Sequence, residues 1–232
     1  MSIKYYKYSN KGPRLKNEDS IKVEFSDSIM WAGIADGVGG AVGGEFASSK
    51  ALELVFDGWR INHDLRQSII DANDEIKEIQ KIVPEYRNMA TTFTGCYVED
   101  DLLYGGHVGD SKLCILRGNG IKQLTYSHTE FNRLYQLGLL TMQERDTYPR
   151  RNVLESALGI NGPLVVQDFS FRIQKGDRVL MTTDGVHEII KKIEFRDLNK
   201  KYDDVDDFGE AIVSVLLKRD LVDNASFVLL SI

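Results

Sequence analysis

The chain has 232 residues, of which 42% are hydrophobic and 28% charged, so it contains enough apolar material for one compact domain spanning 1–232. Its 35 acidic and 29 basic side chains give a formal net charge of -6, which argues against a nucleic-acid partner because such a surface needs a concentrated basic patch. No apolar run approaches the roughly 20 residues needed to cross a bilayer, so no membrane association is expected.

The first third of the chain predicts strands followed by helices. Strand-like runs occupy 3–8, 20–25 and 29–35, and a glycine-rich stretch follows at 37–44. Apolar side chains then recur every three or four residues, the spacing of one buried helical face, at Ala47, Ala51, Leu54, Val55 and Trp59. Asp64 can cap a second helix, whose apolar stripe is Leu65, Ile69, Ala72, Ile76 and Ile79.

The middle of the chain predicts β-hairpins. Strands at 91–98 and 102–106 flank an acidic turn at 99–101. Strands at 112–116 and 121–124 flank Gly118-Asn119-Gly120, in which an Asn-Gly pair is a strong hairpin signal.

The last part mixes short helices with strands. Short helices are expected at 131–137 and after Thr141, which forms a capping-box pattern with Glu144. Asp207 and Glu210 predict the start of another capped helix. Further strands are expected at 165–173, 178–183 and 226–232. Hairpins rather than strict β-α alternation indicate an α+β fold of antiparallel sheets with helices on their outer faces.

Signals of location are few. The N-terminus has no apolar segment of the kind found in secretory signals. Cys96 and Cys114 have no metal-like spacing, and so few thiols suit a reducing compartment. These features predict a cytoplasmic protein.

Several familiar active sites are excluded. Neither cysteine is followed by the phosphate loop of a cysteine-dependent phosphatase. No Gly-Lys-Ser/Thr follows Gly44, so the glycine-rich stretch is not a P-loop, and Val42 occupies the third glycine position of a dinucleotide fingerprint. Nucleophile-elbow and zinc-helix motifs are absent as well.

Acidic residues that follow strand-like runs remain as candidates. Asp36-Gly37, Asp110 and Asp184-Gly185 each come directly after an apolar run. Carboxylates that converge there would resist ionising unless a cation lay among them, and an all-oxygen set favours Mg²⁺ or Mn²⁺. The alternative is structural, since Asp-Gly is the commonest hairpin turn. The pattern by itself leaves both interpretations open.

Taken together, the motifs resemble the metal-dependent Ser/Thr protein phosphatases, the type 2C group of the PPM family, in its compact bacterial form. The matching blocks keep the family's order along nearly the whole chain: 12–19 (GPRLKNED), 35–40 (ADGVGG), 44–48 (GEFAS), 89–92 (MATT), 107–111 (HVGDS), 149–154 (PRRNVL), 157–159 (ALG), 176–177 (GD), 183–186 (TDGV) and 223–226 (DNAS). The resemblance implies a four-layer α-β-β-α sandwich of two antiparallel sheets.

The resemblance also implies a role for each matched residue. Asp36 would bridge two Mg²⁺ or Mn²⁺ ions, and the Gly37 carbonyl and Glu18 would bind the second ion. The remaining implied assignments are Asp184 and Asp223 on the first ion, Asp110 with Asp184 at a weaker third site, Asp19 orienting ligands or waters, and Arg14 binding phosphate. Thr91, Thr92, His107 and His128 are interpreted as structural.

The implied activity is hydrolysis of phosphoserine and phosphothreonine in proteins by direct attack of a metal-activated water. Phosphorylated proteins, and by analogy a cognate Ser/Thr kinase, would be the partners of a monomer. Relatives often carry a histidine where this chain has Val38 or Ala41, so a water must protonate the leaving oxygen here. Ala41 and Ser127 leave two alternatives open: a pseudophosphatase that binds phosphorylated partners without turnover, and a phosphatase of small metabolites.

Overall fold

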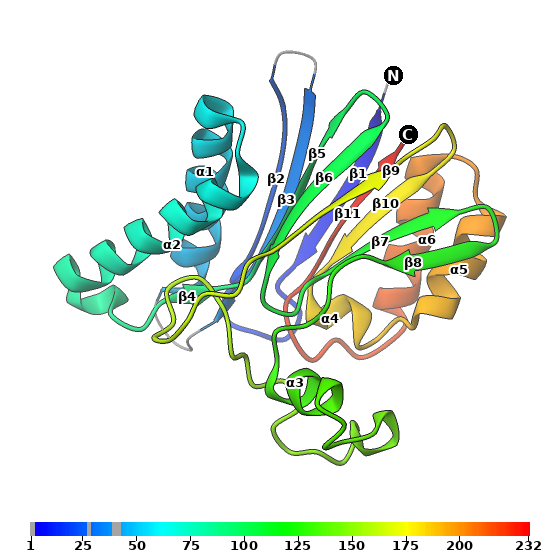
Figure 1. Cartoon of the computed structure of the whole chain (residues 1–232). Helices are drawn as coiled ribbons and strands as arrows, with labels where there is room; N and C mark the ends of the chain where they lie inside the picture. The colour runs from blue at the N-terminus through cyan, green and yellow to red at the C-terminus, as the bar shows by residue number, and fades with distance from the viewer. Residues whose placement is uncertain (1–2, 27–28, 39–42) are drawn as a thin grey trace.

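Two antiparallel sheets pack face to face in the computed structural model, which describes residues 3–26, 29–38 and 43–232 (Figure 1). The first sheet contains, in spatial order, β1 (Lys4–Asn10), β11 (Ala225–Ser231), β10 (Arg178–Thr182), β7 (Lys112–Arg117) and β8 (Gly120–Gln123). The second contains β2 (Asp19–Ser26), β3 (Ile29–Val38), β5 (Phe93–Glu99), β6 (Leu102–Val108) and β9 (Gln167–Arg172), and β4 (Ala90–Thr91) pairs with β3.

Helices cover both outer faces, as Figure 1 shows. The second sheet carries α1 (Gly44–Asn62) and α2 (Leu65–Ile82), followed by the 3₁₀ turn η1 (Pro84–Tyr86). The first sheet carries α4 (Asp184–His187), α5 (Lys192–Lys201) and α6 (Val205–Leu217). These layers confirm the predicted α-β-β-α sandwich.

Strand alternation explains why the layers stack. Along β3, Met30 and Ala32 face the other sheet, whereas Trp31 and Ala35 face α1 and α2. In the first sheet, β11 likewise places Val228 between the sheets and Phe227 against the helices. Central strands buried on both faces therefore read as continuous apolar runs, and their ends are held rigidly.

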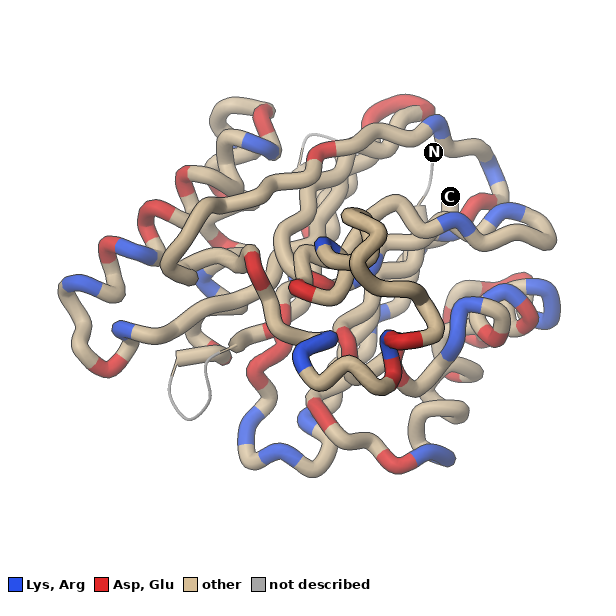
Figure 2. Tube along the Cα trace, turned by 60° about the horizontal axis from the view of Figure 1, so that its bottom comes forward, with Lys and Arg blue, Asp and Glu red and all other residues tan. Residues whose placement is uncertain are grey.

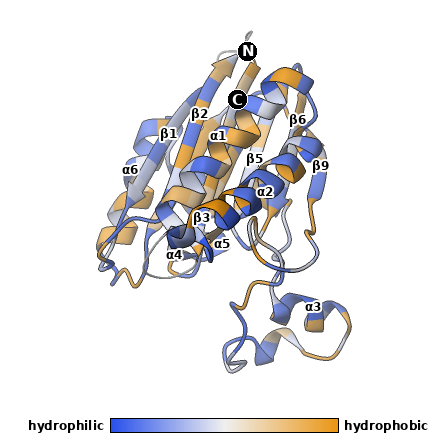
Figure 3. Cartoon of the chain, turned by 90° about the vertical axis from the view of Figure 1, so that its left-hand side faces the viewer, coloured by the Kyte–Doolittle hydropathy of each residue, from blue (hydrophilic) through white to orange (hydrophobic). Residues whose placement is uncertain are grey.

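One segment stands apart from the layers. Residues 126–153, called the projecting segment below, contain α3 (Glu130–Gln136) and the 3₁₀ turn η2 (Met142–Glu144). It extends from one end of the sandwich in Figure 1 and again in the side view of Figure 3. A β-bridge joins Thr129, near its start, to Leu154, the residue directly after it, so the chain enters and leaves at the same place.

Three expectations need correction. The β7–β8 turn consists of Gly118 and Asn119, because Arg117 pairs with Gly120 and Gly118 adopts a φ of 52°. Helix α6 is capped by Asp204, which accepts from the Asp206 backbone N–H, rather than starting at Asp207. Helices α4 and α5 were not predicted, because α4 is a single turn and α5 has few apolar side chains.

Two features bear on environment. Cys96 and Cys114 are free and buried. Among the described residues, no helix is both long and apolar enough to span a bilayer.

Candidate active site

Acidic side chains from distant parts of the sequence meet at one end of the sandwich. They line a cavity of about 210 Å³ and are Glu18, Asp36, Asp110, Asp184 and Asp223. Arg14, Gly37, Val38 and Asn152 line the same cavity. Figure 2 brings this end forward and shows acidic and basic positions close together in its loops. The cavity therefore unites every carboxylate that the sequence proposed as a ligand.

Strand pairing positions Asp36. In the antiparallel pair β2–β3, Asp36 lies directly opposite Asp19. Its backbone is fixed on the other side by Thr92, whose hydroxyl accepts from the Asp36 N–H at 2.9 Å, and whose N–H donates to the Asp36 carbonyl at 2.9 Å. The hydroxyl of Thr91 donates to the same carbonyl at 3.0 Å. Both threonines thus have the structural role predicted for them.

The glycines after Asp36 and Asp184 are required by close backbone approach. A Cβ at Gly37 would overlap the carbonyl oxygens of Gly44 and Glu18, and a Cβ at Gly185 would overlap the Asn224 carbonyl oxygen. Gly37 lies within β3 and Gly185 within α4. The hairpin-turn interpretation of these two Asp-Gly pairs is therefore wrong.

Asn224 holds the cavity's loops together. Its side-chain oxygen accepts from the Glu18 backbone N–H at 2.8 Å. Its amide nitrogen donates to the carbonyls of Lys11 and Lys16 at 2.8 and 2.9 Å. One buried amide thereby fixes the loop that carries Arg14. The sequence analysis assigned Asn224 no role. Its position next to Asp223 was the one feature of the sequence that pointed to the site.

Asp19 lies behind the cavity with 7% of its surface exposed. One carboxylate oxygen accepts from the Thr183 hydroxyl at 2.9 Å, whereas the other has no hydrogen-bond partner among the described residues. An unpartnered buried carboxylate oxygen is unfavourable unless a cation or water satisfies it. This placement agrees with a supporting position beside the proposed ligands.

Arg14 contacts one of the proposed ligands directly. Its Nη2 lies 2.6 Å from Oδ2 of Asp223, while Oδ1 of Asp223 accepts from the Asn224 backbone N–H at 2.8 Å. The neighbouring Leu15 is 97% exposed, so the loop that carries Arg14 lies open to solvent at the cavity edge. Sequence reasoning placed Arg14 at the site but did not foresee its ion pair with Asp223.

Burial and mutual repulsion raise the pKa values of the acidic side chains in and beside the cavity. Burial raises the pKa of Asp36 well above its ordinary value, and the negative charges of Asp19 and Asp184 add to the rise. Burial also raises the pKa of Asp19 to about 7 and that of Asp110 to about 7. The pKa values of Glu18 and Asp184 are raised as well, chiefly by burial. Asp19 and Asp110, whose pKa values lie near neutral pH, ionise fully there only beside a compensating positive charge.

The donor set fits divalent cations. All the acidic groups offer oxygen, which Mg²⁺ and Mn²⁺ prefer, and a cation would offset the repulsion that raises their pKa values. In the side-chain conformations of the described residues, no three His, Cys, Asp or Glu groups surround a single point. Both carboxylate oxygens of Asp223 accept hydrogen bonds in these conformations, Oδ2 from Arg14 and Oδ1 from the Asn224 backbone N–H.

The histidines near the cavity are structural. His107 is buried, with Nδ1 2.8 Å from the Thr94 hydroxyl and Nε2 3.1 Å from the Tyr126 carbonyl. Nδ1 of His128 accepts from the Gly109 backbone N–H at 3.1 Å. Burial lowers the pKa of His107 to about 3 and that of His128 to about 4, so both are neutral. Ala41 lies outside the described residues.

Comparison with known proteins gives a consistent result. The model of the family described as "Protein phosphatase 2C" matches residues 9–226. The serine/threonine phosphatase stp of Listeria welshimeri is 29% identical over 198 residues, which cover 81% of this chain and 79% of the relative. The structure of serine/threonine phosphatase Stp1 from Staphylococcus aureus is 25% identical with a TM-score of 0.92 and covers 100% of this chain and 96% of that one.

A further structure extends the fold comparison. The catalytic domain of the phosphatase PstP, solved with two manganese ions, is 22% identical with a TM-score of 0.80, over 99% of this chain and 97% of that one. The fold and the acidic cavity together define a metal-dependent phosphatase. The chain belongs to the protein phosphatase 2C family.

Proposed function

We propose that the chain is a single catalytic domain that removes phosphate from phosphoserine and phosphothreonine in proteins, using Mn²⁺ or Mg²⁺. The observation that carries this proposal is the convergence of five carboxylates and Arg14 on one cavity in a member of the 2C family. The names of the relatives support protein substrates, since they are serine/threonine phosphatases.

The proposed ligand set follows the cavity lining. Asp36, on which the charges of the neighbouring aspartates act, would bridge two ions. The full assignment is Asp184 and Asp223 on the first ion, Glu18 and the Gly37 carbonyl on the second, and Asp110 with Asp184 at a weaker third site. Asp19 would orient ligands or waters through its oxygen that lacks a described partner.

The ions, when bound, would supply an activated water and neutralise charge on the phosphoryl oxygens. Arg14 would bind those oxygens, because its planar guanidinium can donate two parallel hydrogen bonds and stays charged at any relevant pH. To do so it exchanges its bond to Asp223 for bonds to phosphate. Val38 offers only hydrocarbon at the cavity wall, so a water rather than this side chain protonates the leaving oxygen.

The cellular setting is part of the proposal. We infer a cytoplasmic monomer, since both cysteines are free and buried. A Ser/Thr kinase that phosphorylates the same proteins is the expected functional counterpart, by analogy with the family.

Phosphate release from phosphothreonine peptides, measured with Mn²⁺ and with chelator, tests the proposal. We expect metal-dependent release by the parent and its loss in Asp184→Asn. Metal-dependent capture of the peptide with no release would instead identify a phosphoprotein-binding protein. Faster turnover of small phosphorylated metabolites than of any phosphopeptide would contradict the protein-substrate assignment.

A further inference from the structure

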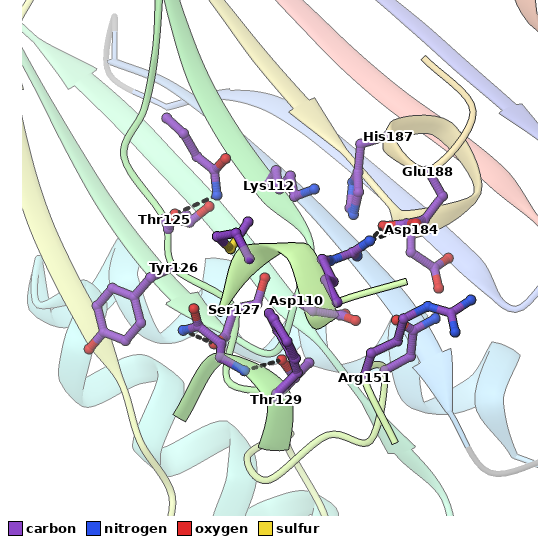
Figure 4. Close-up of a pocket in the computed structure, with 16 residues that line it drawn as sticks. Asp110, Lys112, Thr125, Tyr126, Ser127, Thr129, Arg151, Asp184, His187 and Glu188 are labelled. Carbon is purple, nitrogen blue, oxygen red and sulfur yellow. Dashed lines mark hydrogen bonds and ion pairs between the residues drawn. The ribbon is translucent and has the colours of Figure 1, made fainter. Parts of the chain in front are cut away.

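A second cavity, of about 230 Å³, lies beneath the projecting segment (Figure 4). Its floor is formed by the start of β7, the end of α4 and the residue after α4, including Lys112, His187 and Glu188. Its roof comes from the projecting segment, including Arg145 and Arg151. The volume suits a single side chain rather than a larger ligand.

Ion pairs hold the roof in place. Glu130 accepts from the Arg150 guanidinium at 2.7 to 2.9 Å and also from the Tyr148 hydroxyl, which links the two halves of the projecting segment. Arg145 donates to Glu188, the residue directly after α4, at 2.6 Å, a bond between roof and floor. The side chains of Arg145 and Glu188 are 28% and 31% exposed, so solvent screens this ion pair less than a pair on the open surface. The cavity is therefore a built feature rather than a gap under a loose loop.

Two cations that line this cavity have no carboxylate partner. Of the four arginines in the projecting segment, Arg133, Arg145 and Arg150 pair with described carboxylates, at Glu155, Glu188 and Glu130. Arg151 forms no ion pair with a described carboxylate, and neither does Lys112 on the floor. Figure 4 shows both side chains at the cavity wall. A partly buried cation without a partner is unfavourable, and an anion would relieve that.

The second cavity adjoins the active site. Asp110, Asn152 and Asp184 line both cavities. In the proposed function the two aspartates bind cations, and Glu188 is already paired with Arg145. The negative charge of Glu188 also acts on Lys112. With the two aspartates on cations, Glu188 is the one carboxylate in the described lining that faces three cations, Lys112, Arg145 and Arg151. Positive charge is therefore in excess in the second cavity. A peptide whose phosphorylated residue occupies the active site would place a neighbouring side chain here.

We propose that the second cavity binds an anionic substrate side chain, a carboxylate or a second phosphate, next to the phosphorylated residue. This inference rests on the proposed phosphatase function. Lys112 and Arg151 are its specificity-determining residues, because they supply the charge that distinguishes an acidic neighbour from a neutral one.

The test measures kcat/KM of the Mn²⁺-loaded protein on phosphothreonine peptides that differ at one flanking position. Each position carries alanine, glutamate or a non-hydrolysable phosphonate analogue of phosphoserine. We expect at least one position where an anionic residue raises kcat/KM about tenfold over alanine, mainly through KM. A larger effect of glutamate would identify a carboxylate site, and a larger effect of the phosphonate a phosphate site. Both results support the inference.

Variants of the two cations test whether the preference for anionic peptides arises in the second cavity. Lys112→Met and Arg151→Gln should each bring the ratio of anionic to alanine peptide close to one, whereas Lys112→Arg should retain it. Lys122→Met is the matched control, since Lys122 lies exposed on β8 over the Phe171 ring and outside the cavity lining. Arg151 lies on the projecting segment, so Arg151→Gln remains informative even if Lys112→Met folds poorly.

Two results would overturn the inference. Turnover of all peptides at equal kcat/KM would do so while leaving the proposed phosphatase function intact. Retention of the full preference in both Lys112→Met and Arg151→Gln would do the same. Absence of any phosphopeptide turnover by the parent would overturn the proposed function, and this inference with it.

Discussion

The two adjoining cavities are built in opposite ways. The active-site cavity is lined by short acidic side chains that lie at or near the ends of buried strands, where backbone hydrogen bonds fix their position. The second cavity adds three long basic side chains, two of them from the projecting segment, to a lining that also holds Glu188. Both share the boundary formed by Asp110, Asn152 and Asp184.

In the proposed roles, this difference assigns catalysis to the first cavity and recognition of the substrate to the second. A reaction that depends on ion positions needs side chains with few torsions on rigid elements. Recognition of a substrate side chain tolerates longer and more adaptable cations, which the projecting segment can supply without disturbing the sandwich. Changes in the first cavity should therefore affect all substrates alike, and changes in the second should affect their ranking.

The largest expected effect is that of Asp36→Asn. Removing the central carboxylate should lower kcat/KM on every phosphopeptide by at least about a hundredfold, the order seen when one electrostatic element of an active site is removed. The metal-free variant should melt no lower than the parent, because a buried and repelled charge has been removed. Asp100→Asn is the control, since Asp100 lies in a solvated turn with a φ of 54° that asparagine tolerates. Equal activity of parent and Asp36→Asn would contradict the site.

Gly185→Ala tests the close backbone approach beneath the acidic cavity. The added methyl group would overlap the Asn224 carbonyl, so we expect a loss of about 1–3 kcal/mol in the free energy of unfolding, measured by urea denaturation. Gly120→Ala should change it by less than about 0.5 kcal/mol, because a methyl group there meets only the Arg117 carbonyl at 3.5 Å. A neutral Gly185→Ala would show that the backbones can separate freely.

The pH dependence of Mn²⁺ binding tests the raised pKa values of the first cavity. Because the pKa values of Asp19 and Asp110 are raised to about 7, the metal-free folded protein retains protons there that its unfolded chain loses near pH 4. These groups therefore make the metal-free fold less stable as pH rises from about 4 to 7. Ion binding requires release of the protons, so affinity should rise with pH across the same range.

We expect the Mn²⁺ dissociation constant to fall about fivefold between pH 6 and pH 7 for each proton released from a group with a pKa of about 7. Titration calorimetry in buffers of different ionisation enthalpy counts those protons directly. The buried histidines, whose pKa values are lowered, stay neutral with and without the ion and do not contribute. An affinity that is constant from pH 6 to pH 8 would exclude protonated carboxylates in the metal-free site.

The smallest effect is expected for Arg14→Lys. Lysine keeps the charge but loses the planar fork, so about one hydrogen bond to phosphate is lost, worth about 1 kcal/mol or roughly fivefold in kcat/KM. The loss should be the same for acidic and neutral peptides, unlike that of Lys112→Met. Lys16→Met, in the same exposed loop but outside the cavity lining, is the control. A change in peptide ranking with Arg14→Lys would contradict the separation of the two cavities.

Much of the fold was predictable from local pattern. Apolar runs with hairpin signals predicted the strands, and gaps of three and four residues predicted α1 and α2. Asp64 caps α2 as its sequence indicated, by accepting from the Gln67 backbone N–H at 2.9 Å. Helix α5 was missed because its side chains are mostly charged and only Phe195 is buried, so its periodic signal is weak.

The candidate site, like the fold, was predictable from the sequence only in part. The motif order alone named Glu18, Asp36, Asp110, Asp184 and Asp223, because each is a short acid in a recognisable block. The sequence could not distinguish a hairpin turn from a metal ligand at an Asp-Gly pair, since the same dipeptide occurs in both. The packing of Gly37 against Gly44, and of Gly185 against Asn224, excludes the hairpin turn, and the metal-ligand role of the two aspartates stays a prediction.

The sequence by itself determined the apolar runs that form the central strands, which are buried on both faces. It also determined the acidic residues that lie next to those strands. The tertiary structure alone decided that Asn224 ties the Arg14 loop to Glu18, and that Lys112 and Arg151 line the same cavity. The physical reason is range. Propensity and periodicity act over a few residues, whereas these contacts join residues that are tens to about two hundred positions apart, and only the closed fold brings them together.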